Sequence, residues 1–227
     1  SVTNTLTYLI IQVPIMLILA VIFASLLNNR ALKFRGLFRT CIFLPCATGL
    51  VAYSMIFRTL FTYDGMVNNM LLKFGLISEA INWLNDPVYA KAVIIIGLVW
   101  RWTGYNMVFY LSAMQSIDYS IYEAARIDGL NEFQIFIRMF IPMMKPTYAS
   151  AATITFMGAW NAYLWPKVVM QTNEAITMPM LVANTMGGYV IDYGVVMAAV
   201  TICSLPTVII FFCLQKSFTN AVAGAVK

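Results

Sequence analysis

The sequence predicts an all-α membrane protein, a polytopic helical bundle that forms a single transmembrane domain over residues 1–227. Hydrophobic residues make up 61% of the chain, charged residues only 10%, and the mean hydropathy is +0.80. A soluble domain is roughly 45–50% apolar and about 25% charged. This chain therefore carries more apolar surface than one compact core can bury, and its few charges must mark the loops between spans.

Five apolar runs are long enough to cross a membrane, because about 20 residues at a rise of about 1.5 Å cover the hydrocarbon layer of about 30 Å. They are Leu6–Leu27, Thr40–Phe57, Ala92–Met114, Pro146–Pro166 and Tyr193–Gln215. Within lipid each backbone N–H and C=O needs an internal partner, so these runs are expected to be helices.

A shorter apolar segment is expected outside the membrane, and a capping signal marks the start of the third span. The apolar stretch Ala175–Ile191 is interrupted by Pro179 and by glycines, which indicates a short helix or a re-entrant element. Asp86 followed by Pro87 is typical of an N-cap and a first-turn proline, and it fixes the start of the third span.

Residues 66–74 predict a short helix on the membrane surface. Its apolar residues recur on one face beside polar neighbours. The apolar set is Met66, Val67, Met70, Leu71 and Phe74, and the polar set is Asn68, Asn69 and Lys73. A lid over the bundle is the alternative.

The basic residues predict the orientation, because lysine and arginine are retained on the cytoplasmic side. Nine of them fall in one set of alternate loops: Arg30, Lys33, Arg35, Arg39, Arg126, Arg138, Lys145, Lys216 and Lys227. Four fall in the other: Arg58, Lys73, Lys91 and Lys167. The first set marks the cytoplasm, which places Ser1 outside and the C-terminus inside. Since no cleavable signal accounts for an external start, we expect a further span before Ser1, with a native external start as the alternative.

The long cytoplasmic connection, residues 120–146, reads as a helix, a glycine turn and a second helix. Ser120 with Glu123 forms a capping box that predicts a helix running to Asp128. Gly129 then ends it, because glycine adopts the left-handed conformation without penalty. The second start is Asn131 with Gln134, and Pro142 and Pro146 mark the passage into the fourth span.

The first of these helices has a slim face and a charged one. Ala124 and Ala125 supply the slim face, and Glu123, Arg126 and Asp128 supply the charges. Such an element suits insertion into a cleft of another protein. An interfacial hairpin that only joins two spans is the alternative.

This connection carries a resemblance to a known family. Glu123-Ala-Ala, Asp128-Gly129, Phe136, Ile141-Pro142 and Pro146 resemble the EAA loop of permease subunits in binding-protein-dependent ABC importers. The likeness is closest to the carbohydrate-uptake group, the maltose and glycerol-3-phosphate permease type. It extends over nearly the whole chain, at Asn4-Thr5, residues 34–45, Asn82-Trp-Leu84, Trp160-Asn161, Trp165-Pro166 and residues 224–227. Two positions depart from the pattern: Leu130 replaces the usual alanine and Met139 a frequent isoleucine.

The resemblance implies a mechanism and a set of partners. Glu123, Ala124, Ala125, Asp128 and Gly129 would form a coupling helix and its bend, seated on a cytoplasmic P-loop ATPase present in two copies, which binds ATP and Mg²⁺. The other partners would be a second, related but different permease subunit and an external substrate-binding protein. Six spans in a bacterial plasma (inner) membrane are typical of the family, which agrees with the span expected before Ser1.

Other chemistry is disfavoured by the sequence itself. It contains no phosphate-loop motif and no histidine, and its four cysteines have no metal-ligand spacing. We find no nucleophile, acid and base constellation, so we expect no catalytic residues, metal or cofactor in this chain. The absence of clustered lysines and arginines argues against nucleic acid as a partner.

A substrate path is predicted within the third and fourth spans. A charge inside a span costs roughly 2.5–3.5 kcal/mol on insertion scales, so Arg101 is expected to face the bundle interior or a watery cavity. Aromatic rings stack on sugars and amides bond to hydroxyls. The candidate residues are Arg101, Trp102, Tyr105, Asn106, Trp160 and Asn161. Aromatic belts at the membrane surface are the alternative reading.

The function expected from these features is transport of a sugar or oligosaccharide as one permease subunit of an ATP-driven importer. A self-contained secondary transporter is the alternative, but such carriers commonly place acids or histidine within the membrane, and all nine acids here lie outside the spans. A membrane-bound sensor or scaffold is a third possibility, which predicts that Arg101 and Asn161 can be replaced freely.

Overall fold

The computed structural model describes residues 2–29, 32–169, 176–187 and 192–225, and it confirms the all-α membrane class. Those residues form helices and no strand. The helices are α1 (Val2–Asn28), α2 (Arg35–Ala47), α3 (Leu50–Leu60), α4 (Met66–Lys73), α5 (Pro87–Gln115), α6 (Tyr119–Ile127), α7 (Glu132–Ile135), the π-helical segment η1 (Phe136–Phe140), α8 (Ile141–Met143), α9 (Lys145–Trp160), α10 (Leu164–Val169), α11 (Met178–Thr185) and α12 (Tyr193–Ala225).

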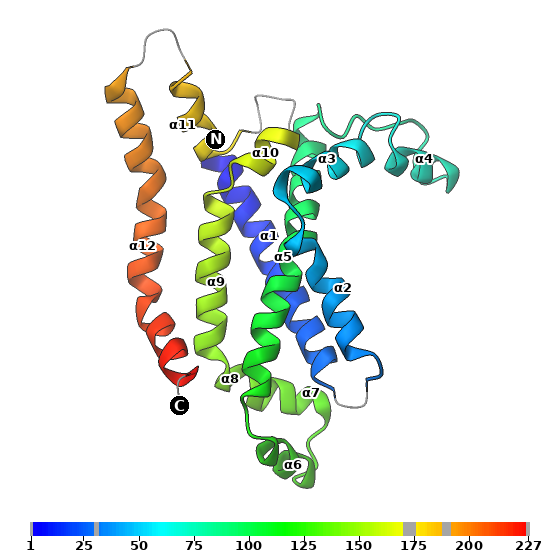
Figure 1. Ribbon diagram of the computed structural model, residues 1–227, viewed down its shortest axis with the longest axis vertical. Coiled ribbons are helices and arrows are strands. Elements are labelled where there is room, and N and C mark those ends of the chain that lie inside the picture. The colour runs from blue at the N-terminus through cyan, green and yellow to red at the C-terminus, as the bar shows by residue number, and fades with distance from the viewer. Residues whose placement is uncertain (1, 30–31, 170–175, 188–191, 226–227) are drawn as a thin grey trace.

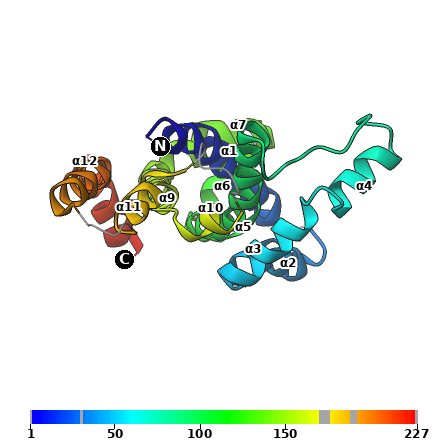
Figure 2. The same ribbon diagram turned by 90° about the horizontal axis from the view of Figure 1, so that it is seen from above.

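Helices α1, α5 and α9 run side by side through the middle of the molecule, with α2 and α12 at opposite edges (Figure 1). Helix α6 lies at one end of the bundle, while α3, α4, α10 and α11 lie at the other. Seen along the bundle, α4 stands well apart from the central helices (Figure 2). The two ends of the molecule are thus built differently.

The packing of α1 on α5 relies on small side chains. Ala20 and Ala24 are fully buried on one face of α1, against Met107, Tyr110 and Leu111 of α5. In lipid, helix association depends on close van der Waals contact, which small residues permit. Gly104 has the same role between α5 and α2, because a Cβ there would collide with the carbonyl oxygen of Ile42.

The membrane spans differ from the five expected ones in two places. Helices α1, α5 and the Tyr193–Cys213 part of α12 are long and apolar enough to cross a membrane. The second expected span is a pair, α2 and α3, bent by 95°. Pro45 has no N–H for the helix ladder, and Thr48 Oγ1 donates to the Pro45 carbonyl oxygen at 2.7 Å, which ends α2.

The fourth expected span also ends early. Helix α9 stops at Trp160, where Asn161 forms the C-cap and its amide donates to the Met157 carbonyl oxygen at 2.9 Å. The chain then turns into the short helix α10, so residues 146–166 are not one continuous helix. Helix α9 alone has 16 residues, about 24 Å at the usual rise.

The structure contains the expected N-cap and the two expected short helices, with one correction. Asp86 Oδ1 accepts the N–H groups of Val88 and Tyr89 at the start of α5, as the N-cap prediction requires. Helix α4 exists and exposes Met66, but Asn68 is fully buried, not on a solvated face. Within the Ala175–Ile191 stretch α11 is the expected short helix, while residues 175 and 188–191 lie outside the described residues.

Candidate functional site

The connection between α5 and α9 forms a hairpin, residues 118–144, at one end of the bundle. Its first helix starts earlier than predicted, because Asp118 is the N-cap of α6 and its Oδ1 accepts the Ser120 N–H at 3.0 Å. The capping box of Ser120 with Glu123 is therefore wrong. The backbone N–H of Ser120, together with its side chain, holds the pKa of Asp118 below its ordinary value.

The turn after α6 has the geometry that the glycine predicts. Gly129 has a φ of +80°, and its N–H donates to the Arg126 carbonyl oxygen at 3.0 Å. The Leu130 N–H donates to the Ala125 carbonyl oxygen at 3.1 Å. These two bonds form a Schellman motif, in which a left-handed residue satisfies the last carbonyls of a helix.

The second half of the hairpin begins with the predicted reciprocal cap. Asn131 Oδ1 accepts the Gln134 N–H at 2.8 Å, and Gln134 Oε1 accepts the Asn131 N–H at 3.1 Å. A π-helical segment, η1, follows and was not predicted. Pro142 lies just after it and lacks the N–H that would continue a regular helix, which favours a change of hydrogen-bond register at this point.

The predicted coupling residues divide between an inner and an outer face. Ala125 is 2% exposed and packs into the hairpin, whereas Glu123, Ala124, Asp128 and Gly129 are exposed. The exposed group lies along one side of α6 and at its C-terminal turn, the part of the molecule farthest from α10 and α11 (Figure 1). This surface is free for another protein.

One residue of this surface has no counterpart among the predicted residues. Ile127, in the last turn of α6, is 86% exposed. An isoleucine at the tip of a hairpin gains nothing from water, and the hydrophobic effect favours its burial by a partner. In the sequence Ile127 is a single apolar residue between two charged ones, Arg126 and Asp128. The charged neighbours led us to treat this part of the helix as a charged face.

The second predicted site lies around Arg101, the central residue of α5. Its side chain is 8% exposed, and Nε and Nη1 have no hydrogen-bond partner among the described residues. The Arg101 Cζ lies 5.1 Å from the ring centroid of Tyr53 and 5.6 Å from that of Trp102. These cation–π contacts stabilise the charge but leave the donors on Nε and Nη1 unused.

Tyr53 of α3 was not predicted as part of this site. Its ring is 1% exposed, it stacks on Trp165 at 4.2 Å and on Trp100 at 5.8 Å, and its hydroxyl also lacks a partner in the described part of the chain. Helical spacing could not reveal it, since the bend between α2 and α3 brings it to Arg101.

The remaining predicted path residues do not all join Arg101. Trp102 and Tyr105 contact each other edge to face at 6.0 Å and are partly exposed. Asn106 is buried, accepts the Thr155 hydroxyl at 3.2 Å and donates to the Trp102 carbonyl oxygen at 3.1 Å. It ties α5 to α9.

Trp160 and Asn161 lie apart from Arg101, at the end of α9 that adjoins α10. Trp160 is 3% exposed, and its Nε1 donates to the Cys203 carbonyl oxygen of α12 at 2.8 Å. Asn161 is exposed and bonded to its own helix. Within the described residues, neither a hydrogen bond nor a ring contact connects them with Arg101, Trp102 or Tyr105.

Two residues of the family pattern near the N-terminus have a structural role. Asn4 Nδ2 donates to the Ile176 carbonyl oxygen at 3.5 Å, and Thr5 Oγ1 accepts the Met178 N–H at 3.1 Å. They connect the start of α1 to the start of α11, two segments far apart in sequence. In the described residues, no group of three or more His, Cys, Asp or Glu side chains is placed to hold a metal ion.

A helical bundle of membrane-spanning length, with an exposed hairpin between two of its long helices, defines a polytopic membrane component. The chain belongs to the family of binding-protein-dependent transport system inner membrane components, whose model matches residues 2–224. This membership makes the chain a component of a transport system in the inner membrane.

Relatives within this family are sugar permeases. Over 160 residues the chain is 56% identical to the lactose transport system permease protein LacF of Rhizobium radiobacter, covering 70% of this chain and 54% of that protein. It is 34% identical to the arabinooligosaccharides transport system permease protein AraP of Halalkalibacterium halodurans, covering 85% and 60%. The chain thus spans little more than half the length of these relatives.

The fold also matches a solved transporter. A chain of a bacterial ABC transporter involved in the import of the acidic polysaccharide alginate superposes with a TM-score of 0.85 at 23% identity, covering 96% of this chain and 77% of that one. At this identity the match establishes the fold.

Proposed function

We propose that this chain is the membrane-spanning subunit of an ATP-driven importer, and that it forms part of the translocation path for a sugar or oligosaccharide. The observation that carries the proposal is the exposed hairpin around α6, with Glu123, Asp128 and Gly129 on its surface. A passive connection between two spans has no need of a charged tip with an exposed isoleucine at position 127.

The hairpin supports docking to a cytoplasmic ATPase. The Schellman turn at Gly129 fixes the end of α6 without any side-chain bulk, so the helix end is free to enter a groove. Glu123 offers a carboxylate to a basic residue there, and Ile127 offers an apolar anchor. The ATPase is present in two copies and binds ATP and Mg²⁺. When the two copies close on each other, the hairpin transmits the movement to the helical bundle.

Two further partners, a second permease and an external binding protein, are supported by the relatives. The lactose permease proteins LacF and LacG of Rhizobium radiobacter both resemble this chain, at 56% and 38% identity. This supports pairing with a second, different permease. A related solved transporter is in complex with an alginate pentasaccharide-bound periplasmic protein, which supports an external binding protein.

For the substrate path, the geometry favours Arg101, Trp102 and Tyr105 as the sugar-contacting group, with Asn161 at a separate level. Arg101 has unused donors, and both aromatic rings are partly exposed. Asn106 and Trp160 use their polar groups to join α5, α9 and α12, and we assign them the role of holding the path open.

The test is purification of the full-length protein from its native membrane, with identification of the subunits that accompany it and assay of ATP-dependent uptake of lactose and arabinooligosaccharides in vesicles. We expect a P-loop ATPase and a second permease to co-purify, and uptake to require ATP and a binding protein. Recovery of the chain alone, active without ATP, would overturn the proposal in favour of a secondary transporter.

A further inference from the structure

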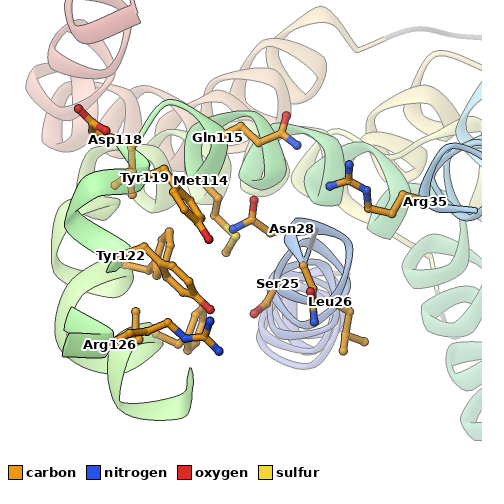
Figure 3. A pocket seen from close by; sticks show the side chains of 15 residues that line it. Ser25, Leu26, Asn28, Arg35, Met114, Gln115, Asp118, Tyr119, Tyr122 and Arg126 are labelled. Atoms are coloured by element: carbon orange, nitrogen blue, oxygen red, sulfur yellow. The ribbon is translucent and has the colours of Figure 1, made fainter. Parts of the chain in front are cut away.

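A hollow of about 990 Å³ separates the hairpin from the ends of α1 and α5. The last turn of α1, the last turn of α5, helix α6 and the π-helical segment η1 form its walls. Figure 3 shows Tyr119, Tyr122 and Arg126 directed from α6 towards the end of α1, where Ser25 and Asn28 lie. None of the functions above uses this space.

The level of the hollow is set by the two spans that end in it. Helices α1 and α5 are both long and apolar enough to cross a membrane, and they end at Asn28 and Gln115. Both residues line the hollow. A span leaves the hydrocarbon layer at its last turn, so the hollow lies at the depth of the lipid headgroups.

The polar part of the lining favours an anion. Two guanidinium groups, of Arg35 and Arg126, line it together with the hydroxyls of Tyr119 and Tyr122. Among the described residues that line the hollow, the one carboxylate is that of Asp118, whose Oδ1 accepts the Ser120 N–H. Guanidinium and hydroxyl donors around a site of net positive charge suit a phosphate group.

The lining also has an apolar part. It consists of Leu26, Met114, Ile117, Ile135, Phe136 and Phe140. An inorganic anion gains nothing from contact with an apolar surface, whereas burial there favours an acyl chain or a glycerol ester. The ligand that satisfies both parts is an amphiphile with a phosphate headgroup.

We propose that the hollow binds the headgroup of an anionic phospholipid from the cytoplasmic leaflet, with the start of an acyl chain against its apolar wall. The leaflet is a local source of such lipids, and basic pockets between transmembrane helices at this depth are suited to them. The bound lipid would fill the space between α6 and α1, and so connect the docking helix to the first span. The leaflet assignment rests on the orientation in the proposed function.

The test measures lipid, not transport. The full-length protein, with the subunits that accompany it, is delipidated in detergent and titrated with phosphatidylglycerol, with phosphatidylcholine and with inorganic phosphate, and bound lipid is counted by native mass spectrometry. The variants are Arg35→Gln, Arg126→Gln and both together. Controls are Arg39→Gln and Arg138→Gln, exposed bases of α2 and η1 outside the hollow. Thermal unfolding checks that every variant is folded.

We expect phosphatidylglycerol to bind more tightly than phosphatidylcholine, each single variant to lose about fivefold in affinity and the double variant on the order of twentyfold, with the controls unchanged. If the double variant retains as much bound phosphatidylglycerol as the controls, the proposal is overturned. Displacement of the lipid by millimolar inorganic phosphate would overturn it in favour of a free-anion site. Binding only after a co-purifying subunit is removed would overturn it in favour of a protein contact. If no ATPase co-purifies, the proposed function fails while the lipid count still decides this site.

Discussion

At the scale of single residues, Arg101 stands out because its charge is buried without a hydrogen-bond acceptor for Nε and Nη1. Within the described ranges, no acidic residue lies in α1, α5, α9 or α12. A buried charge lacking a partner lowers the stability of a fold, and it persists where function needs it.

Replacement of Arg101 should therefore separate stability from transport. We expect Arg101→Met to raise the free energy of unfolding by about 1–2 kcal/mol, since an apolar side chain of similar length replaces a desolvated charge. Uptake of the sugar should fall at least tenfold. Unfolding in mixed detergent measures the first and vesicle uptake the second. Unchanged uptake would favour the sensor or scaffold alternative.

Asn68 gives a second prediction at this scale. Its side chain is fully buried, donates to the carbonyl oxygens of Tyr63 and Ile81, and accepts the Ile81 N–H and the Trp83 Nε1–H. Asn68→Ala leaves these groups without partners, and we expect the segment between α3 and α5 to lose about 2–4 kcal/mol of local stability.

Hydrogen exchange of that segment measures the loss. The matched control is Asn69→Ala, because Asn69 is exposed and makes one bond to the Asp64 carbonyl oxygen. Equal protection in both variants would contradict the structural role of Asn68. Spacing along α4 put both asparagines on one polar face. The bonds of Asn68 to residues 13 and 15 positions later could not be read from that spacing.

At the scale of elements, local capping signals were predictable where the partners are close in sequence. The reciprocal cap of Asn131 and Gln134 and the cap at Asp86 are confirmed. The predicted start of α6 was wrong because Asp118 and Ser120 can both act as N-cap residues. The structure uses Asp118, which comes first in the chain. The 95° bend after Pro45 was not predictable, since proline permits a kink but neighbouring helices set its angle.

The contact between α2 and α5 gives an element-scale prediction. A Cβ at Gly104 would strike the backbone of Ile42, whereas one at Gly158 in α9 meets nothing within 4 Å. We expect Gly104→Ala to lower the free energy of unfolding by about 1–3 kcal/mol through overpacking. Gly158→Ala should be neutral or raise it by up to about 1 kcal/mol through helix propensity. Thermal unfolding of the two variants side by side distinguishes them, and equal effects would contradict the close approach of the helices.

At the scale of the whole molecule, the sequence predicted a helical membrane bundle because composition alone determines that class. The coupling role of the hairpin residues rests on their motif and stays a prediction. Tyr53 beside Arg101 was not predictable, since α3 reaches α5 only through the bend after α2. Two ends of different construction, one with the hairpin and one with α4, α10 and α11, agree with a protein that meets different partners on the two sides of a membrane (Figure 1).

The orientation can be tested by labelling. In a background lacking Cys41, Cys46, Cys203 and Cys213, we expect Ser78→Cys to react with an impermeant thiol reagent from outside intact cells. Ser120→Cys should react only after the membrane is opened. Both serines are exposed on this chain. The reverse pattern would contradict the placement of the hairpin in the cytoplasm.

The central claim, that the hairpin couples transport to an ATPase, is tested most directly by ATP-dependent uptake in vesicles with paired variants. Gly129→Leu and Gly75→Leu both place a side chain at a positive φ, +80° and +66°, with nothing within 4 Å, and so carry the same strain of about 1–2 kcal/mol. Glu123→Lys and Glu79→Lys both reverse an exposed charge.

We predict that Gly129→Leu and Glu123→Lys abolish uptake and weaken ATPase docking while membrane insertion is unchanged. Gly75→Leu and Glu79→Lys should retain uptake. Normal uptake by both hairpin variants would contradict the account.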